Sequence, residues 1–458
     1  MIQQEYSQLF VRIILLLIVI NGIGCSPREL FLNDKSGKQT SQKSIELGAP
    51  EKKLKVDQAN FESFDPRLKK ISLSPSLLAA QKNIFSAQKN VQSIRSQKET
   101  QINSSSNLGP RLDDESLKLE ATTGLTLTKL ISDGGEIDAV VSVAELNVIA
   151  SQLTYLQTFN KQLAEVIRAE QTIVNYRKAK SIYEEQLSVY TENLPLIESA
   201  VKANVIPKTD ALKLEQLKLK SEEAYLSAKT ASQTAKLIRN KYNLTDTDKF
   251  FELDLNKWKS FEKKKNKTNF TKIEAINTQI KILEEDIKSI KSAEKANVSF
   301  AANATANVSN FNNSLGFLGL NISLPVKDGG KKQFDIQGKE LQIASLEKQR
   351  EEALLLNNSS FKALLNFEEI YYLRADLLEA QTGNSQTIYQ DMELKLRAGA
   401  ASVVDLAMEK MNFYDLRSQK NSLEYQKINQ IINFYDTLGD ECSLTELCDQ
   451  VKLFQPSG

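Results

Sequence analysis

In two stretches of the second half of the chain, apolar residues occupy every second position and mainly polar or small residues lie between them. One runs from Phe300 to Val308 and the other from Leu318 to Val326. A period of two is typical of a strand with one apolar and one polar face, and about ten residues is the length of a strand that crosses a bilayer. The first half contains a similar strand from Leu117 to Ile131 and a less regular one from Gln101 to Leu108.

The segments between the paired strands, Gly109–Ser116 and Asn310–Leu315, have the composition of connecting loops. The alternative to membrane strands is a pair of soluble hairpins that pack one face on a core. Four strands cannot close a barrel, and hydrocarbon does not tolerate an open sheet edge. If these strands cross a membrane, several chains must therefore contribute to one barrel.

The chain also contains an internal repeat. Gly124–Gly135 reads GLTLTKLISDGG and Gly319–Gly330 reads GLNISLPVKDGG, at an offset of 195 residues. Lys202–Asp210 (KANVIPKTD) and Arg397–Asp405 (RAGAASVVD) follow at the same offset. Two matches in one register predict an internal duplication without a gap. Each copy then turns from strand to helix at an Asp-Gly-Gly sequence, formed by Asp133, Gly134 and Gly135 and by Asp328, Gly329 and Gly330.

A long helical stretch follows each Asp-Gly-Gly. From Glu136 to Val201 only Pro195 interrupts the helical pattern, and such a helix reaches about 100 Å. The returning helix has a heptad seam typical of a coiled coil, formed by Leu214, Leu217, Ser221, Ala224, Ala228, Ala231, Ala235, Ile238 and Tyr242. The patterns predict a mainly α chain, in which a helix-strand-strand-helix unit occurs twice.

These patterns divide the chain into six segments. They predict a signal peptide at 1–24, a polar tether at 25–63, a first repeat at 64–244, an inter-repeat segment at 245–268, a second repeat at 269–439 and a tail at 440–458. The apolar run Ile13–Ile20 has signal-peptide length and is too short to span a bilayer.

Two cysteine motifs accompany the export signal. Cys25 after Gly24 resembles a lipobox and predicts lipidation, although Gly22 occupies the usual leucine position; an ordinary cleavage site is the alternative. Cys442 and Cys448 could form a disulfide in an oxidising compartment, and two free thiols are the alternative.

The amino-acid composition restricts the functions that are expected of the chain. The chain has no histidine, which removes the commonest general base and metal ligand. Its 59 basic and 58 acidic residues nearly cancel, so no field that attracts nucleic acid is expected. We therefore expect no enzyme, no metal site, no cofactor and no nucleic-acid partner.

The chain resembles the TolC family of outer-membrane efflux and secretion channels. The resemblance rests on the duplication, on the strand and Asp-Gly-Gly before a long helix, and on RAGAASVVDLAMEKMNFYDLRSQ from Arg397, and it covers about Asp57 to Gly439. It implies a homotrimer with a twelve-stranded β-barrel in the outer membrane and a coiled-coil α-barrel in the periplasm. It also implies a passive duct that docks, through a periplasmic adaptor, on an inner-membrane pump or ABC exporter.

The resemblance assigns roles to the two helix–helix turns. Carried over by position, the adaptor-binding tips contain Lys202, Asn204, Pro207, Arg397 and Gly399. Asp210 and Asp405 match acids at the pore entrance. The alternative for both acids is a first-turn residue that stabilises a helix N-terminus, with Ser402 as the cap before Asp405.

Three positions depart from the pattern of the best-known family member. Leu396, Ala401 and Met408 stand where that member has a locking tyrosine, a locking arginine and a second acid. The gating contacts of that protein are therefore not expected here. Two other functions use long helices in the envelope, a periplasmic adaptor and a structural coiled-coil lipoprotein, but neither requires a duplicated strand-and-hairpin unit.

Overall fold

The computed structural model describes residues 65–113, 116–263, 270–307, 315–325, 328–445 and 447, all within the unit Val56–Gly458. The predicted signal peptide, Cys25, the tether and Cys448 lie outside the described residues. Cys442 is disulfide-bonded. Its predicted pairing with Cys448 stays a prediction.

The first repeat begins with α2 (Pro66–Ser72) and α3 (Pro75–Arg95). Both helices start at a proline, which lacks a backbone N–H, and the N–H at that position has no partner within a helix. The short η2 (Ser96–Lys98) leads into β1 (Gln101–Asp113) and β2 (Ser116–Ser132). A hairpin of α4 (Glu136–Lys202) and α5 (Lys208–Lys241) follows, and Pro195 lies inside α4 as predicted.

The second repeat has the same order of elements. After η3 (Lys257–Lys263) come α6 (Thr271–Ser292), β3 (Asn297–Asn307), β4 (Leu315–Ser323), α7 (Lys331–Arg397), α8 (Val403–Leu438) and η5 (Glu441–Leu444). Both α4 and α7 contain 67 residues and are about 100 Å long. The duplicated helix-strand-strand-helix order is therefore confirmed.

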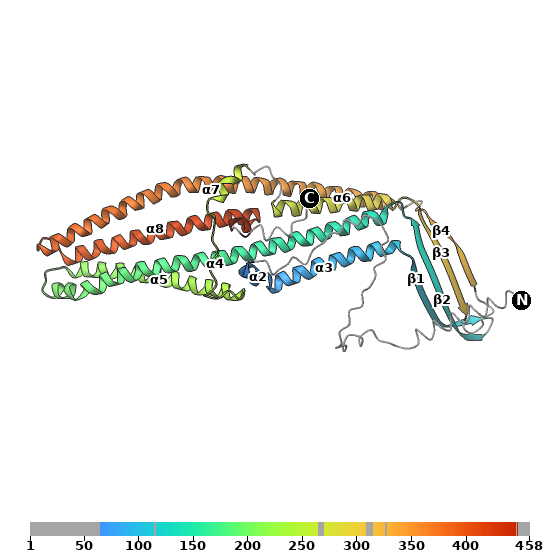
Figure 1. Ribbon diagram of the computed structural model, residues 1–458, viewed down its shortest axis with the longest axis horizontal. Helices are drawn as coiled ribbons and strands as arrows, with labels where there is room; N and C mark the ends of the chain where they lie inside the picture. Colours follow the sequence, from blue (N-terminus) through green and yellow to red (C-terminus); the bar gives the residue numbers. More distant parts are fainter. Residues whose placement is uncertain are drawn as a thin grey trace, which may run out of the picture. The chain divides into compact units, whose positions relative to one another are not determined.

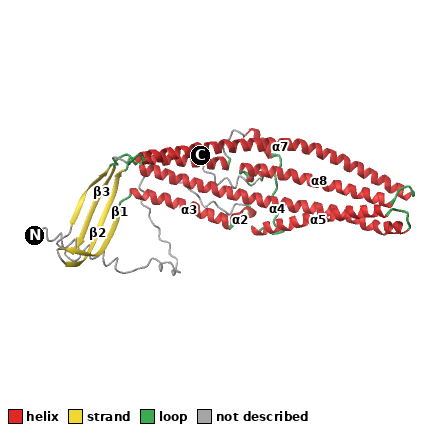
Figure 2. Ribbon diagram, turned by 180° about the vertical axis from the view of Figure 1, so that it is seen from behind, coloured by secondary structure: helices red, strands yellow, loops and turns green. Residues whose placement is uncertain are grey.

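The two long helices have different neighbours. Helix α4 packs against α3, α5, α6 and α8, so that it lies in the middle of the helices in Figures 1 and 2. Helix α7 packs mainly against α6 and α8. Equivalent helices of the two repeats are thus covered to different extents.

The four strands form one antiparallel sheet in the order β1-β2-β3-β4 (Figure 2). Cross-strand partners lie on the same face of a sheet. One row of partners is apolar, and the adjacent row, on the opposite face, is mainly polar. These rows are Ile102, Leu127, Ala302 and Leu318, and Asn103, Thr126, Asn303 and Phe317. β1 and β4 are the edge strands.

The strand limits differ from those predicted. β1 and β2 extend through most of the predicted loop Gly109–Ser116 and leave only positions 114 and 115 between them. β4 ends at Ser323, short of the predicted Val326, because Pro325 cannot donate to a strand ladder. Of the predicted loop Asn310–Leu315, only Leu315 is described, and it is the first residue of β4.

The predicted heptad seam of α5 is also only partly correct. Leu214, Ala235 and Tyr242 are buried as predicted. Ala224 and Ala231 are exposed, whereas Ser232 is buried and Tyr225 is half-buried. Both registers share every seventh residue from Leu214 to Tyr242, and the other covered position of each heptad lies one residue later than predicted.

The two repeats do not align at a single offset. In α3 and α6 the buried residues Leu77, Ile84 and Val91 correspond to Ile273, Ile280 and Ile287, which lie 196 residues later. From β2 onward the offset is 195, as the starts of α4 at Glu136 and α7 at Lys331 illustrate. The expectation of an ungapped repeat is therefore wrong for the first half of the unit, since the first hairpin contains one more residue than the second.

The largest apolar core surrounds the inter-repeat segment. Phe261 packs against Phe361 of α7 and Phe434 of α8, with ring centroids 5.0 and 5.1 Å apart. Leu163 and Ile167 of α4 are fully buried in the same core. By length and composition alone, α4 contains a window apolar enough to cross a membrane. Its central position among the helices accounts for this apolar character.

Candidate functional site

The two helix–helix turns have the same backbone. Ala203 and Ala398 end α4 and α7, and the next residues, Asn204 and Gly399, have φ angles of 56° and 73°. In each turn a backbone N–H reaches back to the last helical turn, from Val205 to Ala200 O at 2.9 Å and from Ala400 to Lys395 O at 2.8 Å. This is the αL ending in which Asn and Gly are the residues of least strain.

The acids that follow these turns have different partners. Asp210 and Asp405 both lie in the first turn of the returning helix. The half-buried Asp210 carboxylate pairs with Lys213 Nζ at 3.0 Å. Asp405 is exposed and lies beside Lys395 and Ala401 in a shallow hollow between α7 and α8. Ser402 caps α8 by accepting from the Val404 N–H at 3.1 Å, as predicted, whereas Pro207 before α5 cannot cap.

An apolar cluster brings the two tips together. Val189 and Ile197 of α4, Leu214 of α5, and Val404 and Met411 of α8 are buried against one another. The predicted tip residues Lys202, Asn204, Pro207, Arg397 and Gly399 are exposed beyond this cluster. The structure thus places both predicted tips at the same end of the helices, on one packed base.

The strand–helix turns are likewise identical in the two copies. Asp133 accepts from the N–H groups of Gly135 and Ile137 at 2.9 and 2.6 Å, and Asp328 accepts from the equivalent groups of Gly330 and Lys332 at 3.0 and 3.1 Å. All four glycines have positive φ. Each aspartate therefore satisfies helix N–H groups that have no partner within the helix.

These hydrogen bonds favour the charged aspartates. Burial pushes the pKa of Asp133 upward, but the N–H groups of Ile137 and Gly135 outweigh burial and hold that pKa below its usual value. The N–H groups of Lys332 and Gly330 lower the pKa of Asp328 in the same way. Both residues have a structural role, because each accepts hydrogen bonds from the first turn of the helix that follows it.

Several solved structures with this arrangement of helices and strands are outer-membrane proteins or channels. The chain matches the outer membrane protein VceC of Vibrio cholerae with a TM-score of 0.68 and 12% identity, over 81% of this chain and 95% of VceC. It matches the CmeC outer membrane channel of Campylobacter jejuni with a TM-score of 0.67 and 12% identity, over 93% of this chain and 97% of CmeC. The chain has a TolC-like fold.

A third similar structure is the open state of the MtrE outer membrane channel of Neisseria gonorrhoeae. The TM-score is 0.62 at 15% identity, over 81% of this chain and 88% of MtrE. No protein-family model matches the sequence, and no curated protein matches it. The TolC-like fold is therefore recognised through structure rather than through overall sequence similarity.

The departures from the family pattern have a physical basis in this TolC-like chain. Met408 is partly buried against the apolar cluster of the tips, where a carboxylate would lose its hydration. Ala401 lines the hollow beside Asp405 and leaves it open. The apolar Met408 therefore contributes to holding the tips together rather than to a charged lock.

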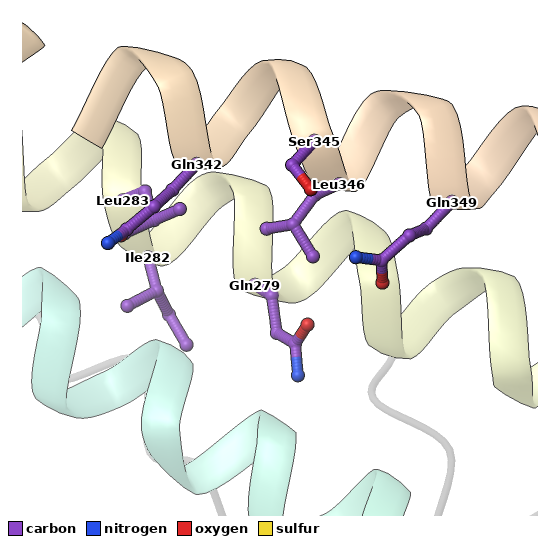
Figure 3. Close-up of a pocket in the computed structure, with 7 residues that line it drawn as sticks. All are labelled: Gln279, Ile282, Leu283, Gln342, Ser345, Leu346 and Gln349. Carbon is purple, nitrogen blue, oxygen red and sulfur yellow. The ribbon is translucent and has the colours of Figure 1, made fainter. Parts of the chain in front are cut away.

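A second groove lies further along the TolC-like helices, between α6 and α7. Figure 3 shows the side chains that line it: Gln279, Ile282, Leu283, Gln342, Ser345, Leu346 and Gln349. The lining has amides, a hydroxyl and aliphatic groups but no titratable group. Within the described residues, no group of three His, Cys, Asp or Glu side chains could hold a metal ion.

The sequence did not point to two pairs of ionisable side chains that contain buried members. Glu170 of α4 lies 3.4 Å from Arg239 Nε of α5 and accepts from the Phe251 N–H at 2.8 Å. Both side chains are almost completely buried. The pair joins the first hairpin to the inter-repeat segment, and its residues do not stand out in the sequence, since other charged residues, Arg168 and Lys241, lie close to them.

The second pair lies at the end of α8. Glu441 is buried and hydrogen-bonds to the carboxyl group of Asp436, which also accepts from Arg168 at 3.0 Å. Burial and the neighbouring Asp436 raise the pKa of Glu441 to about 8. Two carboxyl groups in contact share a proton at neutral pH. Glu441 is therefore a protonated donor that fastens η5 to the end of α8.

Proposed function

We propose that this protein is the outer-membrane exit duct of a tripartite efflux or type I secretion system. Three copies would form a twelve-stranded barrel across the outer membrane and a helical barrel in the periplasm. The TolC-like fold, shared with solved outer-membrane channels, supports this reading. The predicted export signal and the lipobox-like Cys25 fit the same location.

One observation carries the proposal. A four-stranded sheet with an apolar and a polar face has two free edges, and it continues directly into two helical hairpins about 100 Å long. Such a sheet is stable in hydrocarbon only when its edges are paired in a closed barrel. Its polar face then lines a water-filled lumen, which the helices extend into the periplasm.

The exposed tips are the proposed docking end. Lys202 and Arg397 are exposed beside the two turns, and the apolar cluster beneath them gives the turns a rigid base. A periplasmic adaptor would contact these turns, and the adaptor would connect the duct to a pump or ABC exporter. The duct itself is a passive conduit, and we propose no catalytic step.

Fractionation and conductance test the duct. The full-length protein should sediment with the outer membrane, have the mass of three copies after mild detergent extraction, and form ion-conducting pores in planar bilayers. A soluble periplasmic monomer without conductance would overturn the duct and favour an adaptor or a structural lipoprotein.

Photocrosslinking in whole cells tests the docking end. A photoreactive amino acid at Lys202 or at Arg397 should capture a periplasmic adaptor, whereas the same probe at the exposed Lys82 of α3 should not. Capture of the same adaptor at all three positions, or capture at Lys82 alone, would contradict docking at the tips.

A further inference from the structure

One aromatic ring lies on the polar face of the sheet. Among the residues that the structure describes in β1 to β4, Phe317 is the sole aromatic residue on that face, since Phe300 pairs with Leu320 on the apolar one. Its neighbours on the polar face include Asn303, directly opposite in β3, and Asn321, further along β4. Phe317 is 59% exposed. The ring therefore interrupts a face whose other side chains are mainly small or polar.

Gly319 provides the space in which this ring lies. Residues two apart in a strand share a face. A Cβ added at Gly319 would lie 2.7 Å from Cζ of Phe317 and 3.3 Å from both of its Cε atoms. The backbone of Gly319 does not have a positive φ, so its conformation alone does not call for glycine. The tip of the ring therefore occupies the place where a side chain at position 319 would begin, and the ring lies along the strand.

Hydrogen-bonding groups lie beside the ring. Asn303, the cross-strand partner of Phe317, is exposed, and its Oδ1 accepts from Thr305 Oγ1 at 3.1 Å. This contact leaves the amide group of Asn303 as a donor next to the ring. The same row continues across the sheet with Thr126 and Asn103. An apolar plate is thus bordered by amide and hydroxyl groups.

We propose that Phe317 is a stacking site for planar aromatic molecules that pass through the duct, and that Gly319 positions its ring. This inference rests on the proposed function, because the polar face lines a lumen only in a closed barrel. Phe317 precedes the last residue of β4, Ser323, by six residues, which is about 20 Å along a strand. The ring then lies within the barrel, on the path of anything that leaves the helices.

The geometry selects planar aromatic cargo. A ring that lies along the wall presents a face, and aromatic groups stack face to face with an offset. A saturated ring of the same charge does not match that face as closely. The amide of Asn303 suits molecules with polar groups at their edge. One ring in each copy provides a weak contact, as conduction requires, since a strongly bound molecule would not leave.

A purely structural role for Phe317 makes a different prediction. An aromatic side chain that covers a glycine stabilises a strand. In that case Phe317→Ala would lower stability and leave the passage of aromatic molecules unchanged. Passage through assembled channels is therefore the quantity to measure.

Block of the potassium current tests the stacking site. Channels of the full-length protein in planar bilayers are titrated with proflavine, a planar aromatic cation, and with cyclohexylammonium, a saturated ring of the same charge. Phe317→Ala should raise the proflavine concentration for half-block about fivefold, as expected for a lost stacking contact, and leave the cyclohexylammonium block unchanged. Phe317→Tyr should behave as the wild type. Leu320→Ala is the matched control, since Leu320 is also 59% exposed but lies on the apolar face.

A second substitution tests the position of the ring. Gly319→Val fills the space under the ring and should weaken the proflavine block. In the Phe317→Ala background the same substitution should have no further effect, because both changes act through one ring. Additive losses in the double variant would show that Gly319 does not act by positioning Phe317.

The outcomes separate this inference from the proposed duct. Conducting channels in which Phe317→Ala leaves the proflavine block unchanged, or weakens the block by both probes equally, would overturn the stacking site and leave the duct in place. A weaker block in Leu320→Ala alone would also overturn it, because the apolar face would then line the lumen. A protein that forms no conducting channel would overturn both proposals.

Discussion

Asp405 and Asp210 occupy the same position in two copies of one turn, yet only one carboxylate has a cation held against it. Asp210 is paired with Lys213, and its negative charge is compensated locally. Asp405 is exposed beside Ala401, where an alanine leaves the hollow open. In the proposed trimer, three Asp405 carboxylates would form the ring that attracts cations, since rings of charged side chains set the selectivity of a pore.

We therefore expect Asp405→Asn to lower the ratio of cation to anion permeability several-fold in planar bilayers. Asp210→Asn is the matched control and should change the ratio much less, because Lys213 already offsets that charge. Measurement of reversal potentials in a salt gradient gives both ratios. Equal effects of the two substitutions would assign the selectivity to another part of the duct.

The aspartates of the strand–helix turns should contribute to stability in proportion to the N–H groups that they accept. At neutral pH, Asp133→Ala should lower the free energy of unfolding by about 1 kcal/mol, the usual cost of losing a helix cap. Asp133→Asn keeps one acceptor oxygen and should lose about half as much.

The effect of Asp133 should depend on acid pH. The pKa of Asp133 is lowered from its ordinary value of 3.8, so its contribution is present above that value and is lost as pH falls through the lowered folded-state pKa. The unfolding temperatures of the wild type and Asp133→Ala should therefore converge as pH falls below 3.8. A difference that stays constant from pH 7 to well below 3.8 would contradict the role of the charged carboxylate.

At the scale of elements, the hydrogen bond between Glu441 and Asp436 holds η5 against the end of α8. The pKa of Glu441 is raised from 4.5 to about 8, so its contribution to stability is complete below pH 4.5 and is lost progressively as pH rises from there to about 8. Lys272 of α6 donates to the carbonyl groups of Asp436 and Thr437, and Arg168 of α4 pairs with the Asp436 carboxylate. Neither contact uses the proton of Glu441.

We expect the wild-type protein to lose up to about 1.4 kcal/mol of stability for each pH unit between 4.5 and about 8 relative to Glu441→Gln, which cannot deprotonate, and to lose no more above pH 8. Unfolding midpoints measured at a series of pH values from below 4.5 to above 8 give this difference. Parallel pH profiles for the two proteins would show that Glu441 does not titrate in this range.

The elements were predictable where a repeating pattern dominates. The period of two identified β2, β3 and β4, a less regular segment indicated β1, and the two Asp-Gly-Gly sequences identified the starts of α4 and α7. The extra residue in the first hairpin was not predictable, because β1 has few apolar residues and its register is set by pairing with β2. The Glu441–Asp436 pair was missed for another reason: its burial depends on α4 and α6, which are distant in sequence.

At the scale of the whole molecule, adjacent leucines of α7 provide a test of assembly. The exposed Leu355 is equivalent to the buried Asn160, whereas its exposed neighbour Leu356 is equivalent to the exposed Lys161. Leu355→Glu should strongly reduce the trimer fraction, since a buried unpaired carboxylate is costly. Leu356→Glu should leave it nearly unchanged.

Size-exclusion chromatography with mass determination measures both variants, and circular dichroism should show unchanged helix content. A loss of trimer in Leu356→Glu equal to that in Leu355→Glu would contradict the equivalence of the two repeats.

The free edges of β1 and β4 also have a consequence for biogenesis. Before assembly, each chain exposes two rows of backbone donors and acceptors beside an apolar face, which is a template for adding any extended polypeptide. The newly exported chain is therefore prone to aggregate, and aggregation increases with the concentration of unassembled copies. Overproduction beyond the capacity of the outer membrane should yield β-rich aggregates, and factors that shield strand edges during transit should raise the yield of closed channels.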